Sequence, residues 1–369
     1  MQVGIVGLPN VGKSTLFNAL TAAGAQAANY PFCTIDPNVG VVALPDDRLD
    51  VLAGAFRPEK VTPTAIEFVD IAGLVRGAST GEGLGNQFLG HIRLVEAVLH
   101  LVRCFPSSDV VHIYGEVDPL RDKEIVDAEL ALADLDVVER RRERVAKQVQ
   151  GGRAELAVEL AALDKLSAEL QGGRPAREVK LLPAEEAVIR SYGLLTRKPI
   201  IYVANVAEDD LAAAVAEPRS VPAVAPLAEA AAAEGAGLVA LCGDLEAELA
   251  RLARDDRHAF LAEIGLPESG LRRVVHEAYR LLGLLTFFTV GPKEVRAWTL
   301  HAGQTALDAA AEIHSDLARG FIRAEVVAYV DFVRAGRTMA AAREAGAVRG
   351  EGRDYVLADG DIVYVRFNV

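Results

Sequence analysis

The chain has 369 residues, of which 51% are hydrophobic, so it is long enough for two or three domains with sizeable cores. Its formal net charge of −13 argues against a protein that coats nucleic acid by bulk electrostatic attraction, and DNA is not an expected partner. Apolar runs are far shorter than the ~20 residues of a membrane span, and Met1–Val6 leads straight into a strand pattern. We therefore expect no signal peptide, no membrane contact and a cytoplasmic location.

Residues 1–110 alternate short apolar runs with amphipathic stretches. This pattern predicts a sheet covered by helices, which is the α/β fold class. The predicted strands are Val3–Val6, Val39–Leu44, Ile66–Val69 and Val98–Val102, and the predicted helices are Ser14–Ala22 and Asn86–Val95.

A helical insertion is predicted at residues 121–196. β-branched runs are almost absent there, and leucines recur at spacings of three and four from Leu156 to Leu170, which is a helical stripe. Glycine pairs at 151–152 and 172–173 mark the ends of two long helices, which we expect to pack as a coiled-coil hairpin. Strand-like sequence returns at Pro199–Ala204, so the α/β domain is predicted to cover 1–280 around this insertion.

Residues 281–369 are predicted to form a small α+β domain. Turn signals separate predicted strands from predicted helices. The strands are Thr286–Val290, Val295–Leu300, Ile322–Val327 and Ile362–Phe367, and the helices are Leu307–Leu317 and Met339–Ala345.

A phosphate-binding loop is predicted directly after the first strand. Residues Gly7–Ser14 match the pattern G-x-x-x-x-G-K-[ST], and Thr15 follows. In such a loop the backbone N–H groups face the phosphates, Lys13 neutralises the β- and γ-phosphate oxygens, and the Ser14 hydroxyl binds Mg²⁺. The flanking strand and helix favour this interpretation over a simple glycine-rich turn.

Two further segments are candidates for sensing the nucleotide. Asp70 ends a predicted strand and begins Asp-Ile-Ala-Gly, where the carboxylate would hold Mg²⁺ through water and the Gly73 N–H would meet the γ-phosphate. Thr34 lies in a proline-bounded segment and is the candidate second hydroxyl ligand of Mg²⁺. The alternatives are an ordinary strand-end turn and a loop threonine without a ligand.

Hydrolysis needs a group that orients the attacking water. The glutamine that usually follows D-x-x-G is Leu74 here, which predicts slow intrinsic hydrolysis unless another group helps. The candidates are a monovalent cation beside Asn10 and the side chain of His112, although a lone histidine is more often structural. The glycine-rich residues Gly77–Gly85 are predicted to form a switch loop, or alternatively a flexible linker.

The expected base is adenine. Guanine is normally read by N-K-x-D after a strand, where the aspartate accepts two hydrogen bonds from the guanine edge. The corresponding residues are Asn205, Val206, Ala207 and Glu208, so the lysine is lost and the glutamate is one methylene too long. A guanine edge left unpaired loses much discrimination, and ATP preference is the predicted consequence.

Taken together, these residues resemble the YchF family of Obg-like ATPases over essentially the whole chain. The motifs that carry the resemblance are residues 7–15, 29–35, 70–79, 81–89, 205–208 and 293–299. It implies an Obg-type P-loop NTPase domain, a coiled-coil insertion and a C-terminal TGS domain of β-grasp type. It also implies ATP hydrolysis with Mg²⁺, often helped by K⁺, and association with the ribosome.

The resemblance also assigns binding residues. Phosphates would be bound by Asn10, Val11, Gly12, Lys13, Ser14 and Thr15, and Mg²⁺ by Ser14 and Thr34. Asn205, Val206 and Glu208 would lie near the base. Leu241-Cys242-Gly243 departs from the small-residue S-A-K loop of related NTPases, which weakens the base contact expected there.

Two arginine-rich stretches are candidate surfaces for ribosomal RNA. One lies on a predicted helix and contains Arg140, Arg141, Arg142, Arg144 and Lys147; the other is the arginine-rich tail. A solvated, salt-bridged face is the alternative for each. The three cysteines, Cys33, Cys104 and Cys242, lack metal-ligand spacing and are expected to be free thiols.

The preferred hypothesis is an ATP-hydrolysing switch protein that regulates translation or a stress response on the ribosome or its large subunit. The alternatives are a GTPase of the same architecture and an ATP-gated RNA- or ribosome-binding module with little hydrolysis.

Overall fold

The structure, a computed structural model, describes residues 1–26, 38–71, 84–107 and 110–368. Its residues form two compact units. Within the described residues, the first holds 1–26, 38–41 and 67–274, and the second holds 42–66 and 275–368. The sequence-based boundaries place 42–66 in the nucleotide-binding domain, whereas in the structure this segment packs with the C-terminal residues.

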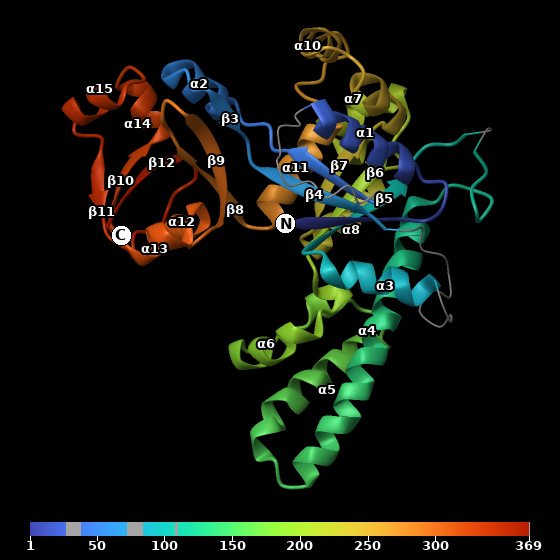
Figure 1. Ribbon diagram of the computed structural model, residues 1–369. Helices are drawn as coiled ribbons and strands as arrows, with labels where there is room; N and C mark the ends of the chain where they lie inside the picture. Colours follow the sequence, from blue (N-terminus) through green and yellow to red (C-terminus); the bar gives the residue numbers. More distant parts are fainter. Residues whose placement is uncertain (27–37, 72–83, 108–109, 369) are drawn as a thin grey trace. The chain divides into compact units, whose positions relative to one another are not determined.

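The first unit is built on a six-stranded sheet (Figure 1). In spatial order its strands are β2 (Val39–Ala43), β4 (Ala65–Asp70), β1 (Gln2–Val6), β5 (Ala97–Arg103), β6 (Ile200–Asn205) and β7 (Gly237–Leu241). From β4 to β7 each neighbouring pair is parallel. Every residue of β5 and β6 is buried, because helices cover both faces of the sheet, and this explains why most of their residues are apolar.

This unit also contains helices outside the hairpin that is described below. They are α1 (Lys13–Gln26), α3 (Leu84–Leu94), α7 (Glu208–Ala216), α8 (Ala225–Glu234), α9 (Gly243–Leu249), α10 (Arg254–Glu263) and α11 (Gly270–Leu281), whose last residues belong to the second unit. Because the carboxyl ends of parallel strands meet at one edge of a sheet, the carboxyl ends of β1, β4, β5, β6 and β7 converge there.

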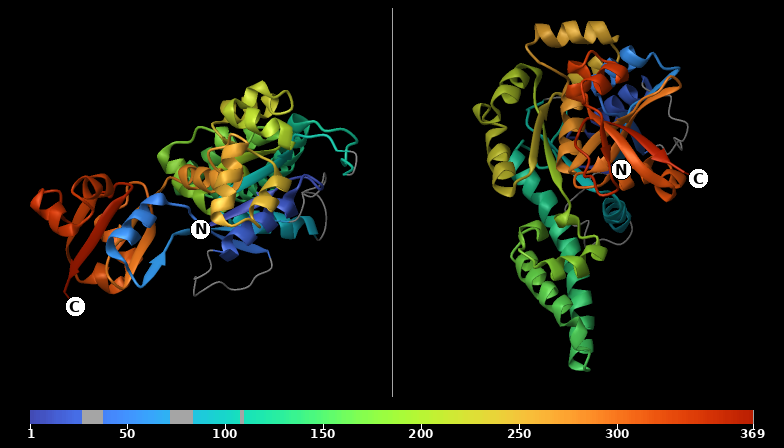
Figure 2. Two further views of the ribbon diagram at one scale, coloured as in Figure 1. Left: turned by 90° about the horizontal axis from the view of Figure 1, so that it is seen from above. Right: turned by 90° about the vertical axis from the view of Figure 1, so that its left-hand side faces the viewer.

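The helical hairpin is confirmed. Helix α4 (Pro119–Gln150) runs away from the sheet and α5 (Ala157–Gln171) returns alongside it, followed by the short α6 (Pro183–Ile189) (Figures 1 and 2). The leucine stripe is the contact face, since Leu163, Leu166 and Leu170 pack in one buried cluster with Val138 and Val145 of α4.

Polar groups fix the base of this hairpin. The buried Asp134 of α4 accepts hydrogen bonds from the backbone N–H groups of Leu195 and Thr196 at 2.8 Å each and from the Thr196 hydroxyl at 2.7 Å. Nearer the sheet, Lys123 of α4 forms ion pairs with Asp127 at 2.7 Å and with Glu234 of α8 at 2.5 Å. Hydrogen-bonded and paired charges of this kind specify how the helix leaves the sheet.

The second unit contains its own six-stranded sheet. In spatial order its strands are β11 (Arg349–Glu351), β10 (Phe321–Ala328), β12 (Asp361–Phe367), β8 (Leu284–Thr289), β9 (Glu294–His301) and β3 (Lys60–Thr62). One face packs against α12 (Ala306–Ile313) and α13 (Ser315–Arg319). The other packs against α2 (Asp47–Phe56), α14 (Tyr329–Arg334) and α15 (Met339–Glu344). The predicted α+β class therefore holds for this unit.

The segment 42–66 completes this sheet and its core. Strand β3 pairs in parallel with β9, and Leu49 and Leu52 of α2 are buried in the same cluster as Phe288. Arg48 adds an ion pair with Asp359 at 2.6 Å. The second unit is therefore not made by the C-terminal residues alone.

The predicted single helix Leu307–Leu317 is two helices. His314 has an extended backbone, with φ −168° and ψ 140°, which ends α12. Its Nδ1 accepts a hydrogen bond from the Asp316 N–H at 3.1 Å, so the same residue caps α13. None of the helices among the described residues combines the length and the apolar character needed to cross a membrane.

A buried histidine makes the first unit sensitive to acid. His100 on β5 is fully buried, and burial is the main cause that lowers its pKa from 6.5 to about 4; the nearby Lys123 and Arg177 also lower it, while Asp127 and Glu234 raise it. The unfolded chain binds a proton near pH 6.5 and the folded chain does not. Protonation of His100 therefore does not reduce the free energy of unfolding above pH 6.5, and it reduces this free energy progressively as the pH drops towards 4.

Replacing His100 with glutamine should remove this part of the pH dependence. Between pH 7 and pH 4, wild type should lose about 3 kcal/mol more unfolding free energy than the variant, because each pKa unit corresponds to about 1.36 kcal/mol. Urea unfolding at several pH values measures the difference. His258→Gln, at an exposed position, is the control. Parallel curves for wild type and His100→Gln would contradict the prediction.

Candidate functional site

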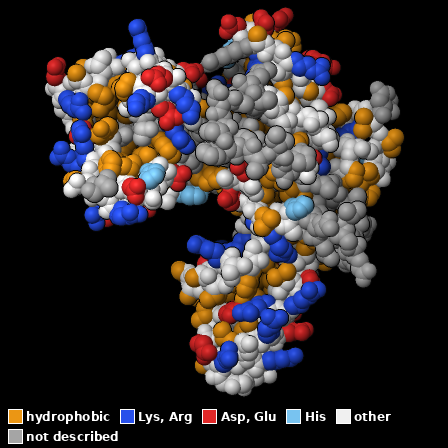
Figure 3. All heavy atoms as spheres, in the orientation of Figure 1, with side chains coloured by type: hydrophobic (Ala, Val, Ile, Leu, Met, Phe, Trp, Pro, Cys, Tyr) orange, Lys and Arg blue, Asp and Glu red, His pale blue; other side chains and the backbone are white. Residues whose placement is uncertain are grey.

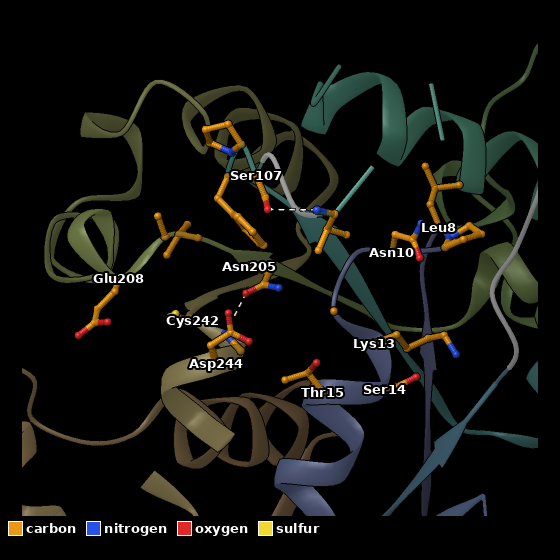
Figure 4. Close-up of a pocket in the computed structure, with 18 residues that line it drawn as sticks. Leu8, Asn10, Lys13, Ser14, Thr15, Ser107, Asn205, Glu208, Cys242 and Asp244 are labelled. Carbon is orange, nitrogen blue, oxygen red and sulfur yellow. Dashed lines mark hydrogen bonds between the residues drawn. The ribbon is translucent and has the colours of Figure 1, made fainter. Parts of the chain in front are cut away.

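The predicted phosphate loop joins β1 to α1 (Figure 4). Its two motif glycines are required by close contacts. A Cβ at Gly7 would lie 2.6 Å from the Leu101 carbonyl oxygen. At Gly12 it would lie 2.5 Å from the Asn205 side-chain nitrogen, and Gly12 also has φ +95°, which L residues rarely adopt. The loop therefore packs against β5 and β6 with no room for side chains at these two positions.

The two predicted charged groups meet at the start of α1. The Lys13 ammonium donates a hydrogen bond to Asp70 Oδ1 at 2.7 Å, and both side chains are largely but not fully buried. Lys13 is the first residue of α1, and Ser14 and Thr15 continue its first turn, where unpaired N–H groups and the helix dipole favour an anion. The carboxylate at the end of β4 therefore lies beside Lys13, the residue that the sequence predicts to bind the phosphates.

Asn10 has an unusual backbone conformation and a contact to a distant segment. Its φ is +64°, in the left-handed region that asparagine tolerates better than most residues. Its side-chain N–H₂ donates to the Val111 carbonyl oxygen at 3.2 Å. The loop is thus tied to the segment that follows β5.

The Asn205 side chain joins three segments by hydrogen bonds: the end of β6, the phosphate loop and the turn between β7 and α9. Its side-chain N–H₂ donates to the Val11 carbonyl oxygen at 3.0 Å, and its Oδ1 accepts from the Gly243 N–H at 2.9 Å. The side chain is buried at the carboxyl end of β6, and Val206 beside it is 1% exposed. The amide is used to hold the phosphate loop against the turn between β7 and α9.

These segments enclose a cavity of about 1040 Å³ at the carboxyl edge of the sheet (Figure 4). Phosphate-loop residues line one part of it. The residues after β5, β6 and β7 line the rest. The full lining is Leu8, Pro9, Asn10, Gly12, Lys13, Ser14, Thr15, Phe105, Pro106, Ser107, Val110, Asn205, Val206, Ala207, Glu208, Cys242, Gly243 and Asp244.

Two carboxylates lie at the end of the cavity opposite Lys13. Glu208 begins α7, is exposed, and points away from Asn205 in Figure 4. Asp244, in the first turn of α9, lies close to Asn205 in the same view. The sequence motif after β6 predicts Glu208 near the base, whereas no motif points to Asp244.

His112 lies in a buried, fully bonded position. Its Nδ1 accepts from the Tyr114 N–H at 3.2 Å, so Nε2 carries the proton that is shared with Asp122 Oδ2 at 2.7 Å. The side chain is buried and does not line the cavity. Neither ring nitrogen can hold a water unless one of these bonds breaks, and this geometry favours the structural role over water positioning.

Several predicted residues lie outside the described residues. These are Thr34, Gly73, Leu74, Cys33 and the first part of Gly77–Gly85. Their assignments remain predictions. The two described cysteines are free and buried. Burial raises the pKa of the Cys104 thiol to about 12 and raises that of Cys242, so both stay protonated near neutral pH.

Sequence reasoning missed the segment that follows β5. Phe105, Pro106, Ser107 and Val110 line the cavity, and Arg103 lies fully buried beneath them. No spacing rule connects these residues to the phosphate loop. The available signal is Arg103 itself, because an arginine at the end of a strand that is otherwise mostly apolar needs buried partners.

The basic stretch on α4 is mostly paired. Arg140 forms an ion pair with Asp136 at 2.9 Å, Arg141 with Glu159 and Arg142 with Asp164, each at 2.6 Å. Figure 3 shows both basic and acidic side chains on the visible face of the hairpin. In the tail, Arg343 and Arg366 both pair with Glu325. These pairs favour salt-bridged faces over open basic patches.

A phosphate loop after the first strand of a largely parallel sheet, with a lysine and a carboxylate in contact beside it, defines a P-loop nucleoside triphosphatase. A family model described as "50S ribosome-binding GTPase" matches residues 2–139, and one named YchF-GTPase_C, described as a protein of unknown function, matches 284–368. Relatives named "Ribosome-binding ATPase YchF" extend the similarity to the whole chain.

The relative from Bacillus subtilis is 51% identical over 369 residues and covers 100% of both chains. The relative from Haemophilus influenzae is 52% identical and covers 100% of this chain and 99% of its own. A solved structure titled "Structure of the Schizosaccharomyces pombe YchF GTPase" matches with a TM-score of 0.88 and 34% identity, covering 99% of this chain and 97% of that one. The chain belongs to the YchF family.

Replacing Gly12 with alanine should abolish nucleotide binding, because the new Cβ would meet the Asn205 amide and the backbone would be strained at φ +95°. Equilibrium binding of a fluorescent ATP analogue measures the loss, which we expect to exceed tenfold. Gly90→Ala is the matched control, since a Cβ at this position in α3 meets nothing within 4 Å. An unchanged affinity in Gly12→Ala would contradict the packing argument.

Replacing His112 with glutamine should lower stability and leave the catalytic rate nearly unchanged. The bonds to Asp122 and Tyr114 would be perturbed inside a buried site, with an expected loss of roughly 1–3 kcal/mol. Thermal unfolding and kcat for ATP hydrolysis are measured side by side. A fall in kcat of a hundredfold without loss of stability would instead assign His112 to the water.

Proposed function

We propose that the chain is an ATP-hydrolysing switch protein that acts on the ribosome. The observation that carries this proposal is the joint geometry of Lys13 and Asp70 at a cavity lined by the phosphate loop. The printed names of its full-length relatives, "Ribosome-binding ATPase YchF", support both the reaction and the partner. A ribosome-bound role also supports a cytoplasmic location.

The residues present fit a nucleotide with Mg²⁺. Ser14 lines the cavity and offers a hydroxyl oxygen, and Asp70 offers a carboxylate beside Lys13. Hard oxygen donors of this kind, with phosphate oxygens, are what Mg²⁺ prefers. When bound, the ion would neutralise charge on the phosphates. Thr34 as a further ligand, the Gly73 N–H at the γ-phosphate, and K⁺ beside Asn10 belong to this proposal as well.

Hydrolysis depends on parts of this chain that hold the phosphates still. Lys13 and the N–H groups of the first turn of α1 would neutralise and orient the phosphate oxygens. Asn205 would keep the phosphate loop in place through its bond to Val11. With Leu74 in the usual glutamine position, intrinsic turnover should be slow, and an ATP-gated ribosome-binding module with little hydrolysis is the natural alternative.

ATP is proposed as the preferred nucleotide. Val206 takes the place of the lysine that would cover a guanine ring, and Glu208 points away from Asn205. A GTPase is the second candidate, because Asp244 supplies a carboxylate in the cavity and the similar structure from Schizosaccharomyces pombe is titled a GTPase. The two candidates differ in one measurable quantity, the ratio of ATP to GTP affinity.

The test is competition of ATP and GTP for a fluorescent ATP analogue, with Mg²⁺ and K⁺ present. ATP should displace the analogue at least tenfold better, a difference of about 1.4 kcal/mol in binding free energy. Lys13→Ala should abolish binding and hydrolysis. Equal or better displacement by GTP, lost in Asp244→Asn, would establish the GTPase. A Lys13→Ala protein that still hydrolyses ATP would overturn the site.

A further inference from the structure

Arg103 is the largest fully buried side chain of the described structure, with 1% of its surface exposed. It is the last residue of β5, whose other residues are also buried. A guanidinium stays charged in proteins, so its burial is tolerated only where its N–H groups find acceptors.

The acceptors of Arg103 are backbone carbonyl oxygens. Its Nε donates to Phe105 at 3.0 Å and its Nη1 donates to Val110 at 3.0 Å, with a longer contact of 3.5 Å from Nη1 to Asn10. Its Cζ lies 4.8 Å from the centroid of the Phe105 ring. No ion pair to Arg103 is present among the described residues. Within the part of the chain that the structure describes, the guanidinium therefore bonds to backbone carbonyl oxygens and lies over one aromatic ring.

The three acceptors belong to two different parts of the cavity. Asn10 lies in the phosphate loop, whereas Phe105 and Val110 belong to the segment after β5, and all three residues line the cavity. The bond from the Asn10 side chain to Val111 joins the same two parts. The guanidinium thus lies beneath the junction between the phosphate loop and one wall of the cavity.

We propose that Arg103 is a positioning residue that holds this wall in register with the phosphate loop, so that the phosphates and the nucleoside of one ligand are bound together. The inference rests on the proposed nucleotide site. Arg103 does not line the cavity and acts through Asn10, Phe105 and Val110.

The consequence is a difference between two ligands. ATP contacts both parts of the cavity, so its affinity depends on how well the two parts are held at the right separation. Inorganic triphosphate contacts the phosphate loop alone. Loosening the wall therefore weakens ATP binding and leaves triphosphate binding almost as it was.

The experiment measures both ligands, as Mg²⁺ complexes, on the full-length chain. In Arg103→Gln the affinity for ATP falls at least tenfold, while that for inorganic triphosphate changes less than threefold. Arg103→Lys keeps the charge but lacks the planar fork of donors, so it restores ATP affinity only in part and replaces Arg103→Gln if the latter does not fold. Arg197→Gln, whose guanidinium donates to the Ala176 carbonyl oxygen away from the cavity lining, leaves both affinities unchanged.

Each other outcome has a definite meaning. If a folded variant loses affinity for ATP and for triphosphate equally, Arg103 does not hold the wall in register with the phosphate loop, because a general loss of structure affects both ligands alike. Unchanged ATP affinity in folded Arg103→Gln overturns it as well. A wild-type chain that binds triphosphate but not ATP removes the proposed function itself, which is separate from the failure of Arg103.

Discussion

The site depends on the two hydrogen bonds of one buried amide. Asn205 donates to the Val11 carbonyl oxygen and accepts from the Gly243 N–H, so it needs a donor and an acceptor on one short side chain. Aspartate would offer only acceptors and would leave an oxygen against an oxygen. Because both ends of the amide are used in this way, Asn205 stabilises the cavity, which is also lined by Phe105, Val206 and Asp244.

Buried charge plays a comparable part at the base of the hairpin. Arg177 pairs with Glu234 at 3.0 Å, and Tyr202 of β6 donates to the same carboxylate at 2.8 Å. The charges at this junction are hydrogen-bonded as well as paired, and removing one partner of a buried pair typically costs about 3–5 kcal/mol. The apolar stripe brings α4 and α5 together, but these polar contacts fix where the pair leaves the sheet.

Much of this could be predicted from the sequence, for a local reason. The phosphate loop, the strand before it and the helix after it occupy adjacent residues. The spacing of the leucines from Leu156 to Leu170 likewise predicts the helix that contains them. Contacts between distant segments that carry no motif are not predictable in this way. Strand β3 has three residues, mostly exposed, and its Thr62 bonds to Glu294, 232 positions away. The contact of Arg103 with the phosphate loop is not predictable in this way, because Asn10 lies 93 positions away and no sequence pattern links the two residues.

The segment 42–66 connects the two units along the chain. The chain leaves the first unit along β2, forms α2 and β3 in the core of the second unit, and returns along β4, which ends at Asp70. The two segments predicted to sense the nucleotide, around Thr34 and at Asp70, flank this excursion in sequence. A domain merely appended after residue 281 would share one connection with the nucleotide site. This unit is instead also connected through the strand that carries the carboxylate beside Lys13, so the second unit is built into the path between the two sensing segments.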